Sequence, residues 1–140
     1  MEIAPKKVGD KALMQFIAKC VMRDWVVLTP VGDCDRFDCV IDRGNGFEKV
    51  QVKAARIRNG CVHFATCSNH YHTKQGQITG NYKKNYKGEV DLFGIYCFDT
   101  DKCYIVKVDD VGNVEANLRV DPPKKGKDNA SIKWAKDYEI

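Results

Sequence analysis

Apolar residues recur at helical spacing near the start of the chain. Between Val8 and about Arg23 they fall every three or four positions, at Ala12, Leu13, Phe16, Ile17, Cys20 and Val21. This spacing places them on one face of an α-helix. Asp10 falls in the first turn of the predicted helix, where a carboxylate interacts favourably with the helix dipole.

Strand-like segments fill much of the remaining chain. They are apolar or alternate in polarity, and turn residues separate them: Trp25–Leu28, a hairpin over 36–53, Gly60–Thr66, Val90–Phe98, Cys103–Val108 and Val114–Val120. Residues 67–88 show neither helical spacing nor strand alternation. We therefore expect a long loop-like segment with some local structure there, and because it is both basic and aromatic, we expect it to be functional. The terminal segment 132–138 is expected to form a short helix or a strand that docks on the body. One helix followed by a mainly antiparallel sheet indicates an α+β fold.

The hairpin over 36–53 has a predictable register. A two-residue or a four-residue turn around Gly44-Asn45 places Asp38 directly opposite Gln51. Period-two alternation then separates two faces. One face carries Asp38, Val40, Asp42, Gln51 and Lys53. The other face carries Phe37, Cys39, Ile41, Val50 and Val52, all of which are apolar.

Composition narrows the class of protein. The chain has 140 residues, 44% of them apolar, which is enough for one hydrophobic core, so we expect a single domain over residues 1–140. The formal net charge of +4 is too small to establish nucleic-acid binding by itself. Seven cysteines, without a CxxC pair or a secretory leader, indicate reduced thiols and a cytoplasmic protein. The apolar runs are too short to span a bilayer, so no membrane role is expected.

Asp38, Gln51 and Lys53 form a candidate hydrolytic site. The carboxylate and the amide supply hard oxygen ligands that suit Mg²⁺, which needs only one or two carboxylates. A neighbouring lysine can orient water and stabilise charge on phosphorus, so the three residues could hydrolyse a phosphodiester. The alternative is an exposed salt bridge between Asp38 and Lys53. Three further acids compete with Asp38: Asp42, for which we expect an Asx-turn role, and Asp33 and Asp35, which lie in the approach loop.

Longer motifs extend this pattern over nearly the whole chain. "FD" at 37–38 and "QVK" at 51–53 resemble the PD-(D/E)xK nuclease signature, with glutamine in place of the acidic residue. The further motifs are "VGDKAL", "TPVGDCDRFDCVID", "VQVKAARIRNGCVHF", "NYKGEVDLFGIYCFDTDKCYIV" and "LRVDPPKKGKDNASIKWAKDYEI". In this order they resemble the PD-(D/E)xK homing endonucleases encoded in group I introns of the cyanobacterial type.

The resemblance implies a restriction-endonuclease-like core, with a mixed but mainly antiparallel sheet and flanking helices. It implies a site-specific, Mg²⁺-dependent endonuclease that cuts both strands of a long duplex, with Mn²⁺ as another usable ion and no small-molecule cofactor. The implied catalytic residues are Asp10, Asp38, Gln51 and Lys53. The implied metal ligands are Asp10, Asp38, Gln51 and the backbone carbonyl of Val52. A homo-oligomer, either dimer or tetramer, would supply one active site for each strand.

Double-stranded DNA is expected to contact basic and polar residues elsewhere on the domain. The candidates are Arg56, Arg58, His72, Lys74, Gln75, Gln77, Tyr82, Lys83, Lys84, Lys124, Lys125 and Lys127. Two alternatives stay open. A Holliday-junction resolvase or a restriction-type nuclease would use the same catalytic hairpin. A non-catalytic zinc- or DNA-binding module would use the dense run of Cys61, His63, Cys67, His70 and His72.

Overall fold

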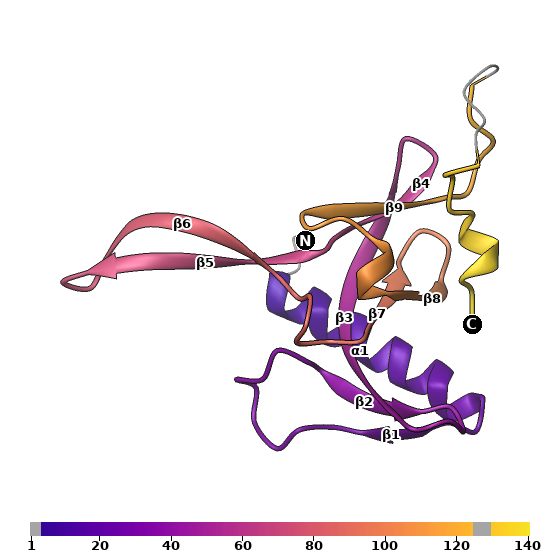
Figure 1. Cartoon of the computed structure of the whole chain (residues 1–140), viewed down its shortest axis with the longest axis horizontal. Coiled ribbons are helices and arrows are strands. Elements are labelled where there is room, and N and C mark those ends of the chain that lie inside the picture. Colours follow the sequence, from indigo (N-terminus) through magenta and orange to yellow (C-terminus); the bar gives the residue numbers. More distant parts are fainter. Residues whose placement is uncertain (1–3, 125–129) are drawn as a thin grey trace.

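The computed structural model of the chain describes residues 4–124 and 130–140, and Figure 1 labels its elements. In chain order these are α1 (Pro5–Met22), β1 (Val26–Leu28), β2 (Cys39–Asp42), β3 (Phe47–Arg58), β4 (Cys61–Ala65), β5 (Cys67–Lys74), β6 (Gln77–Asn85), β7 (Leu92–Cys97), β8 (Lys102–Lys107), η1 (Val108–Asp110), β9 (Glu115–Arg119) and η2 (Ala135–Asp137). Outside the hairpin, the predicted strands occur with ends shifted by about one or two residues.

Helix α1 begins earlier than its apolar pattern predicts. Pro5 is its first residue, a position where the fixed φ of proline suits a helix and the missing N–H leaves no hydrogen bond unmade. Asp10 therefore lies beyond the first turn, and the prediction that it sits there against the helix dipole is wrong. The apolar face is confirmed for Ala12, Phe16 and Cys20, which are buried, whereas Val21, predicted on the same face, is 53% exposed. No helix among the described residues is long and apolar enough to cross a lipid bilayer.

The long strand β3 organises the sheet. Its first part pairs antiparallel with β2, and its last part pairs antiparallel with β4. Strand β7 runs parallel to the middle of β3 and carries β8 on its other edge. The main path is β1-β2-β3-β4-β9. Within residues 4–124 and 130–140, this mostly antiparallel sheet with one α-helix confirms the predicted α+β fold class.

Strand β7 divides the hydrophobic core between the two sides of the sheet. Leu92 and Tyr96 pack in a cluster with the buried face of α1. Phe93 and Ile95 pack in a second cluster on the other side. Because Lys53 is the register partner of Ile95 in the neighbouring strand, its side chain leaves the sheet on the second side, away from α1.

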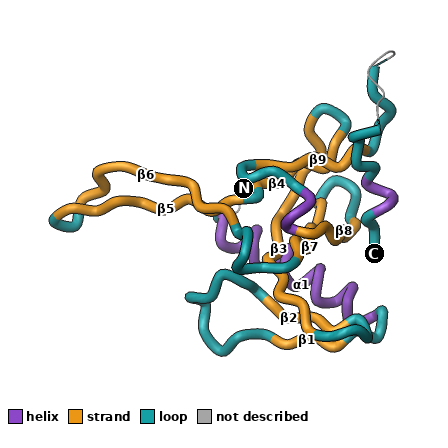
Figure 2. Tube along the Cα trace, in the orientation of Figure 1, coloured by secondary structure: helices purple, strands orange, loops and turns teal. Residues whose placement is uncertain are grey.

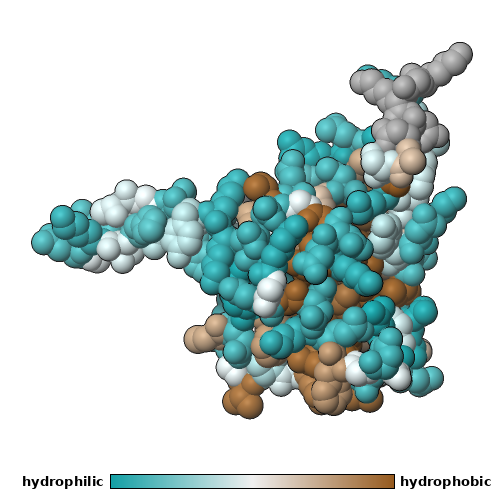
Figure 3. Space-filling model, viewed as in Figure 1, coloured by the Kyte–Doolittle hydropathy of each residue, from teal (hydrophilic) through white to brown (hydrophobic). Residues whose placement is uncertain are grey.

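Residues 67–88, for which the sequence shows no clear period, contain a hairpin arm formed by β5 and β6. These two strands pair only with each other and project away from the body (Figures 1 and 2). Almost all side chains beyond the root of the arm are exposed, and its surface is largely hydrophilic (Figure 3). Since neither face of the arm is buried, its strands need no alternation of apolar and polar residues. The sequence pattern therefore does not indicate them.

The C-terminal segment docks on the body, as predicted. Trp134 bridges to Arg119 of β9, and Glu139 bridges to Tyr104 of β8. The side chain of Tyr138 packs against the core cluster that contains Phe93. The segment adopts a short 3-10 helix between these two bridges. It therefore runs from β9 to β8.

The seven cysteines all carry free thiols. Cys34 is exposed and the other six are buried. Burial raises the pKa of both Cys20 and Cys39 to about 12, which keeps these thiols protonated at neutral pH. They serve as small apolar residues of the core, as the sequence suggests for several of the cysteines.

Candidate active site

The predicted register of the β2–β3 hairpin is confirmed from Asp42 back to Cys39, which pairs with Val50. Asp42 pairs with Phe47 beside the turn. At the other end, the backbone N–H of Asp38 donates a hydrogen bond of 2.8 Å to the carbonyl of Val50. The strand pairing ends at Cys39 with Val50, and Asp38, one residue before β2, bonds to Val50 instead of forming the predicted pair with Gln51.

Of two predictions for residues at or near the ends of β2, one is confirmed and one is wrong. Asp42 Oδ1 accepts a hydrogen bond of 2.8 Å from the Gly44 N–H, which confirms its Asx role in the turn. Phe37 was predicted to share a face with Cys39, but it packs against the core cluster on the Lys53 side of the sheet. That prediction was wrong because residue 37 precedes the strand, so period-two alternation does not extend to it.

Asp38 is half-buried and anchored by one of its two carboxylate oxygens. Its Oδ2 accepts a hydrogen bond of 2.9 Å from the backbone N–H of Val52. Burial raises the pKa of the Asp38 carboxyl, while that hydrogen bond and the charge of Lys53 lower it, and burial has the larger effect. The carboxylate is thus held in place by the backbone of β3 in an environment of reduced solvation.

Lys53 extends toward the root of the arm. Its Nζ donates hydrogen bonds to Tyr86 Oη at 3.2 Å and to the carbonyl of Cys67 at 3.3 Å. Among the described residues it forms no ion pair with Asp38. The alternative of an exposed salt bridge between these two residues is therefore wrong.

The oxygen atoms near Asp38 fit a hard divalent cation. Within the part of the chain that the structure describes, Asp38 Oδ1 and the Gln51 amide have no hydrogen-bond partner. Both groups are therefore free to bind a ligand. The predicted third ligand, the carbonyl of Val52, belongs to the residue whose N–H anchors Asp38. One carboxylate, one amide and one carbonyl are ligands that Mg²⁺ accepts when water and substrate phosphate complete its shell.

Asp10 lies apart from this group in the hydrogen-bond network. It is exposed on α1 and lines a surface pocket with Tyr96 and Phe98. In the described ranges, no hydrogen bond or ion pair joins it to Asp38 or Lys53. The competing acids of the approach loop, Asp33 and Asp35, are exposed.

The residues expected to contact DNA lie in three places. Seven of them lie on the arm: His72, Lys74, Gln75, Gln77, Tyr82, Lys83 and Lys84, and all seven are exposed. Arg56 and Arg58 are exposed at the end of β3, where Arg56 forms an ion pair of 3.3 Å with Asp99. Lys124 is exposed, whereas Lys125 and Lys127 lie outside the described residues. The arm therefore carries the largest group of expected DNA contacts.

The run of cysteines and histidines does not converge on a metal site. His63 Nδ1 lies 2.9 Å from Asn117 Oδ1, and His70 stacks on Tyr82. The thiol of Cys67 contacts the carbonyl of Val114. In the described part of the chain, no three His, Cys, Asp or Glu side chains are arranged to hold a metal ion. The structure thus gives the zinc-module alternative no support.

Arg36 is a functional candidate that the sequence reasoning missed. Its guanidinium donates hydrogen bonds to Glu89 Oε2 at 2.6 Å, to Ser68 Oγ at 2.5 Å and to the carbonyl of Asn85 at 2.6 Å. It also lies 3.9 Å from the ring centroid of Tyr86. These partners are 32 or more positions away along the chain, so no local pattern could reveal them.

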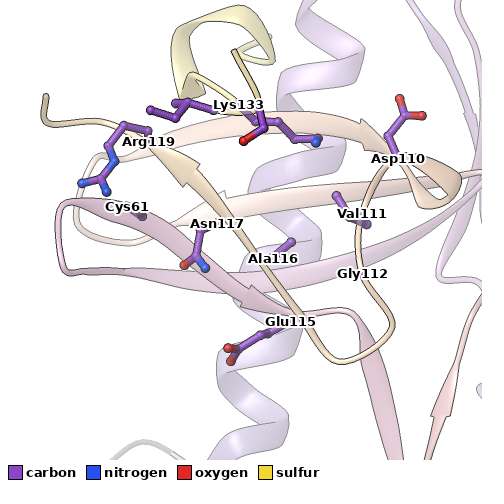
Figure 4. Close-up of a pocket in the computed structure, with 11 residues that line it drawn as sticks. Cys61, Asp110, Val111, Gly112, Glu115, Ala116, Asn117, Arg119 and Lys133 are labelled. Atoms are coloured by element: carbon purple, nitrogen blue, oxygen red, sulfur yellow. The ribbon is translucent and has the colours of Figure 1, made fainter. Parts of the chain in front are cut away.

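A separate cavity lies between β4, β9 and the C-terminal segment (Figure 4). It has a volume of about 360 Å³, and its lining includes the charged residues Asp110, Glu115, Arg119 and Lys133. None of Asp38, Gln51 and Lys53 lines it. This cavity is therefore separate from the candidate site.

Comparisons with known proteins agree with this arrangement. Residues 3–140 match the model of a family described as PD-(D/E)XK endonuclease. Among solved structures, the bacterial homing endonuclease I-Ssp6803I is similar, with a TM-score of 0.75 and 24% sequence identity over 98% of this chain and 89% of that one. No curated protein sequence matches the chain. The family match covers the hairpin, the helix and the arm together.

Proposed function

This chain belongs to the PD-(D/E)XK endonuclease family, and from that membership we propose that it is a Mg²⁺-dependent homing-type endonuclease. As an endonuclease of this family, it is a phosphodiester hydrolase whose substrate is DNA. Family members generally use a divalent metal ion. The proposal adds that the enzyme is site-specific, cuts both strands of a long duplex and prefers Mg²⁺, with Mn²⁺ as an alternative ion.

The observation that carries the proposal is that, among the described residues, Asp38 Oδ1 and the Gln51 amide have no hydrogen-bond partner. Asp38 Oδ1, the Gln51 amide and the carbonyl of Val52 would hold the ion. A divalent ion bound there would supply positive charge to the scissile phosphate and so lower the barrier to attack by water. The other oxygen of Asp38 is already fixed by the Val52 N–H, which limits the freedom of this carboxylate before it binds the ion.

Lys53 would act directly on the reacting atoms. Its ammonium would orient the attacking water and stabilise negative charge that develops on the phosphate. Gln51 contributes an uncharged oxygen, so the site binds Mg²⁺ more weakly than one with two carboxylates. That Asp10 also binds the ion stays a prediction. Because no hydrogen bond or ion pair among the described residues joins Asp10 to Asp38 or Lys53, we expect Asp10→Asn to reduce cleavage much less than Asp38→Asn does.

Single-domain organisation and oligomeric assembly complete the proposal. We expect residues 1–140 to fold as one domain and to assemble as a dimer or a tetramer. Since one active site cuts one strand, a double-strand break at a defined position calls for two sites in one assembly. Cross-linking of the protein bound to cleaved duplex would show two or four copies.

The decisive experiment is a cleavage screen over a randomised duplex library, first with Mg²⁺ and then with Mn²⁺ or EDTA. We expect the wild-type protein to select a long target, and both Lys53→Ala and Asp38→Asn to lose cleavage while they retain duplex binding. Matched controls are Lys136→Ala and Asp109→Asn, which change exposed residues of the same types. Undiminished cleavage by Lys53→Ala or Asp38→Asn would overturn the assignment.

A second substrate separates the homing function from junction resolution. The protein is offered a linear duplex that carries the selected target and a four-way junction of unrelated sequence. The proposal predicts cleavage of the linear duplex at one position. Preference for the junction regardless of sequence would instead identify a resolvase.

A further inference from the structure

The ammonium of Lys53 is held by both roots of the arm. Its two hydrogen-bond acceptors are the carbonyl of Cys67, the first residue of β5, and the hydroxyl of Tyr86, the residue after β6 ends at Asn85. The arm leaves the body at this point (Figure 1). The position of Lys53 is therefore set by the segment that carries most of the expected DNA contacts.

Tyr86 is the fixed member of this pair. Its side chain is only 4% exposed, and its ring meets Phe93 edge to face at a centroid distance of 5.6 Å. Arg36 lies 3.9 Å from the ring centroid and Lys53 Nζ lies 4.7 Å from it. Two cations in contact with one buried phenol restrict its motion, because each gains from the electron-rich ring face.

Arg36 ties the two roots together. It bonds Ser68 on β5 and the carbonyl of Asn85 on β6, and it pairs with Glu89 beyond the arm. Arg36 also lies two positions before Asp38 in the chain. One guanidinium therefore connects both strands of the arm to the segment that delivers the candidate metal ligand.

We propose that Tyr86 is the positioning residue for Lys53, and that through it the arm's seating on DNA sets the geometry of phosphodiester hydrolysis. This inference rests on the proposed function, in which Lys53 acts on the scissile phosphate. A hydrogen bond from an ammonium to a fixed hydroxyl is charge-assisted and directional, so it restricts where the ammonium can lie. A purely structural role for Tyr86 would need its buried ring but not its hydroxyl.

The test removes only the hydroxyl. Tyr86→Phe keeps the ring, and with it the contacts of Arg36 and Phe93. The matched control is Tyr104→Phe, which removes the hydroxyl of another buried tyrosine, bonded to Thr100 rather than to Lys53. Single-turnover cleavage and duplex affinity in EDTA are measured on a target recovered from the library screen, and thermal melting checks the fold.

We expect Tyr86→Phe to lower the cleavage rate by about tenfold or more, since small displacements of a reacting group are costly, while duplex affinity stays within about twofold. Tyr104→Phe should cleave at the wild-type rate. Equal rates for the two variants, or a loss of affinity without a loss of rate, would overturn the inference. The proposed function would fail separately, through wild-type cleavage by Lys53→Ala.

A second variant keeps the inference testable if Tyr86→Phe does not fold. Arg36→Lys retains the positive charge but loses the planar fork that reaches three partners at once. We expect a lower cleavage rate and faster proteolysis near the root of the arm. A wild-type cleavage rate in Arg36→Lys would contradict the inference.

Discussion

The ring of Phe16 lies directly against the backbone of Gly94. A Cβ atom at position 94 would come within 2.5 Å of Phe16 Cε2, which is closer than real Cβ contacts allow. Phe16 is fully buried between α1 and the sheet, so its ring has little room to turn. Only glycine at this position lets the helix approach β7 so closely.

Gly94→Ala should therefore destabilise the fold by about 1–3 kcal/mol, the usual cost of overpacking a tight core. Urea unfolding followed by tryptophan fluorescence measures this change. Gly9→Ala is the control, because nothing lies within 4 Å of a Cβ there and alanine favours a helix by about 0.5–1 kcal/mol. If Gly94→Ala unfolded at the same urea concentration as the wild type, the close contact would be refuted.

Asp38→Asn should stabilise the metal-free protein at pH 7. The raised pKa of Asp38 means that its charged form is less favourable in the folded state than in the unfolded state. The stability that the protonated Asp38 carboxyl contributes is fully present below its ordinary pKa of 3.8. This stability is lost as the pH rises through the raised pKa of the folded state. An uncharged asparagine avoids this loss.

Thermal melts in EDTA at pH 7 and at pH 3 check this difference. Asp38→Asn should melt above the wild type at pH 7, and the gap should close at the lower pH. Asp109→Asn, at an exposed acid, is the control. A lower melting temperature for Asp38→Asn at pH 7 would show that its charge stabilises the fold.

Gln51→Glu should lower the Mg²⁺ concentration needed for half-maximal cleavage by about tenfold, because a second carboxylate strengthens binding of a hard cation. A Mg²⁺ titration of the cleavage rate on the selected duplex measures it. Asn113→Asp adds the same charge at an exposed position away from the hairpin and should leave the midpoint unchanged. An unchanged midpoint in Gln51→Glu would remove Gln51 from the ligand set.

Lys74→Ala should weaken duplex binding about equally for target and non-target sequences. Lys74 is exposed at the end of β5, far along the arm, where a contact to phosphate carries no sequence information. The slope of log affinity against log salt should fall by about one unit, as expected for one lost phosphate contact. Lys136→Ala is the control, and a slope equal to that of the wild type would place Lys74 outside the interface.

The sequence predicted those parts of the fold in which local chemistry dictates geometry. The turn around Gly44 set the register that pairs Asp42 with Phe47 and Cys39 with Val50, and helical spacing identified the buried face of α1. Both signals are local, because they arise within one hairpin or one helix. The prediction for Phe37 was wrong because it extended strand alternation beyond the end of β2.

Other features depend on contacts between distant segments. The arm was not predicted as a hairpin because its strands bury neither face, and its β5–β6 pairing follows no apolar pattern. Arg36 and Tyr86 were overlooked because their partners come from β3, β5 and the residues after β6. No spacing rule in a single sequence indicates that a tyrosine and a lysine 33 positions apart share a hydrogen bond.

The exposed arm has a consequence for how target preference can diverge. Its outer side chains contribute little to the hydrophobic core, whereas Cys67 and Tyr86 at its base are buried. Substitutions over 69–83 can therefore accumulate with little loss of folding stability, whereas substitutions of the buried Cys67 and Tyr86 at the root of the arm would destabilise the fold. Since we expect the arm to contact DNA, a tip transplanted from a relative would change those expected contacts and leave Asp38 and Lys53 unchanged.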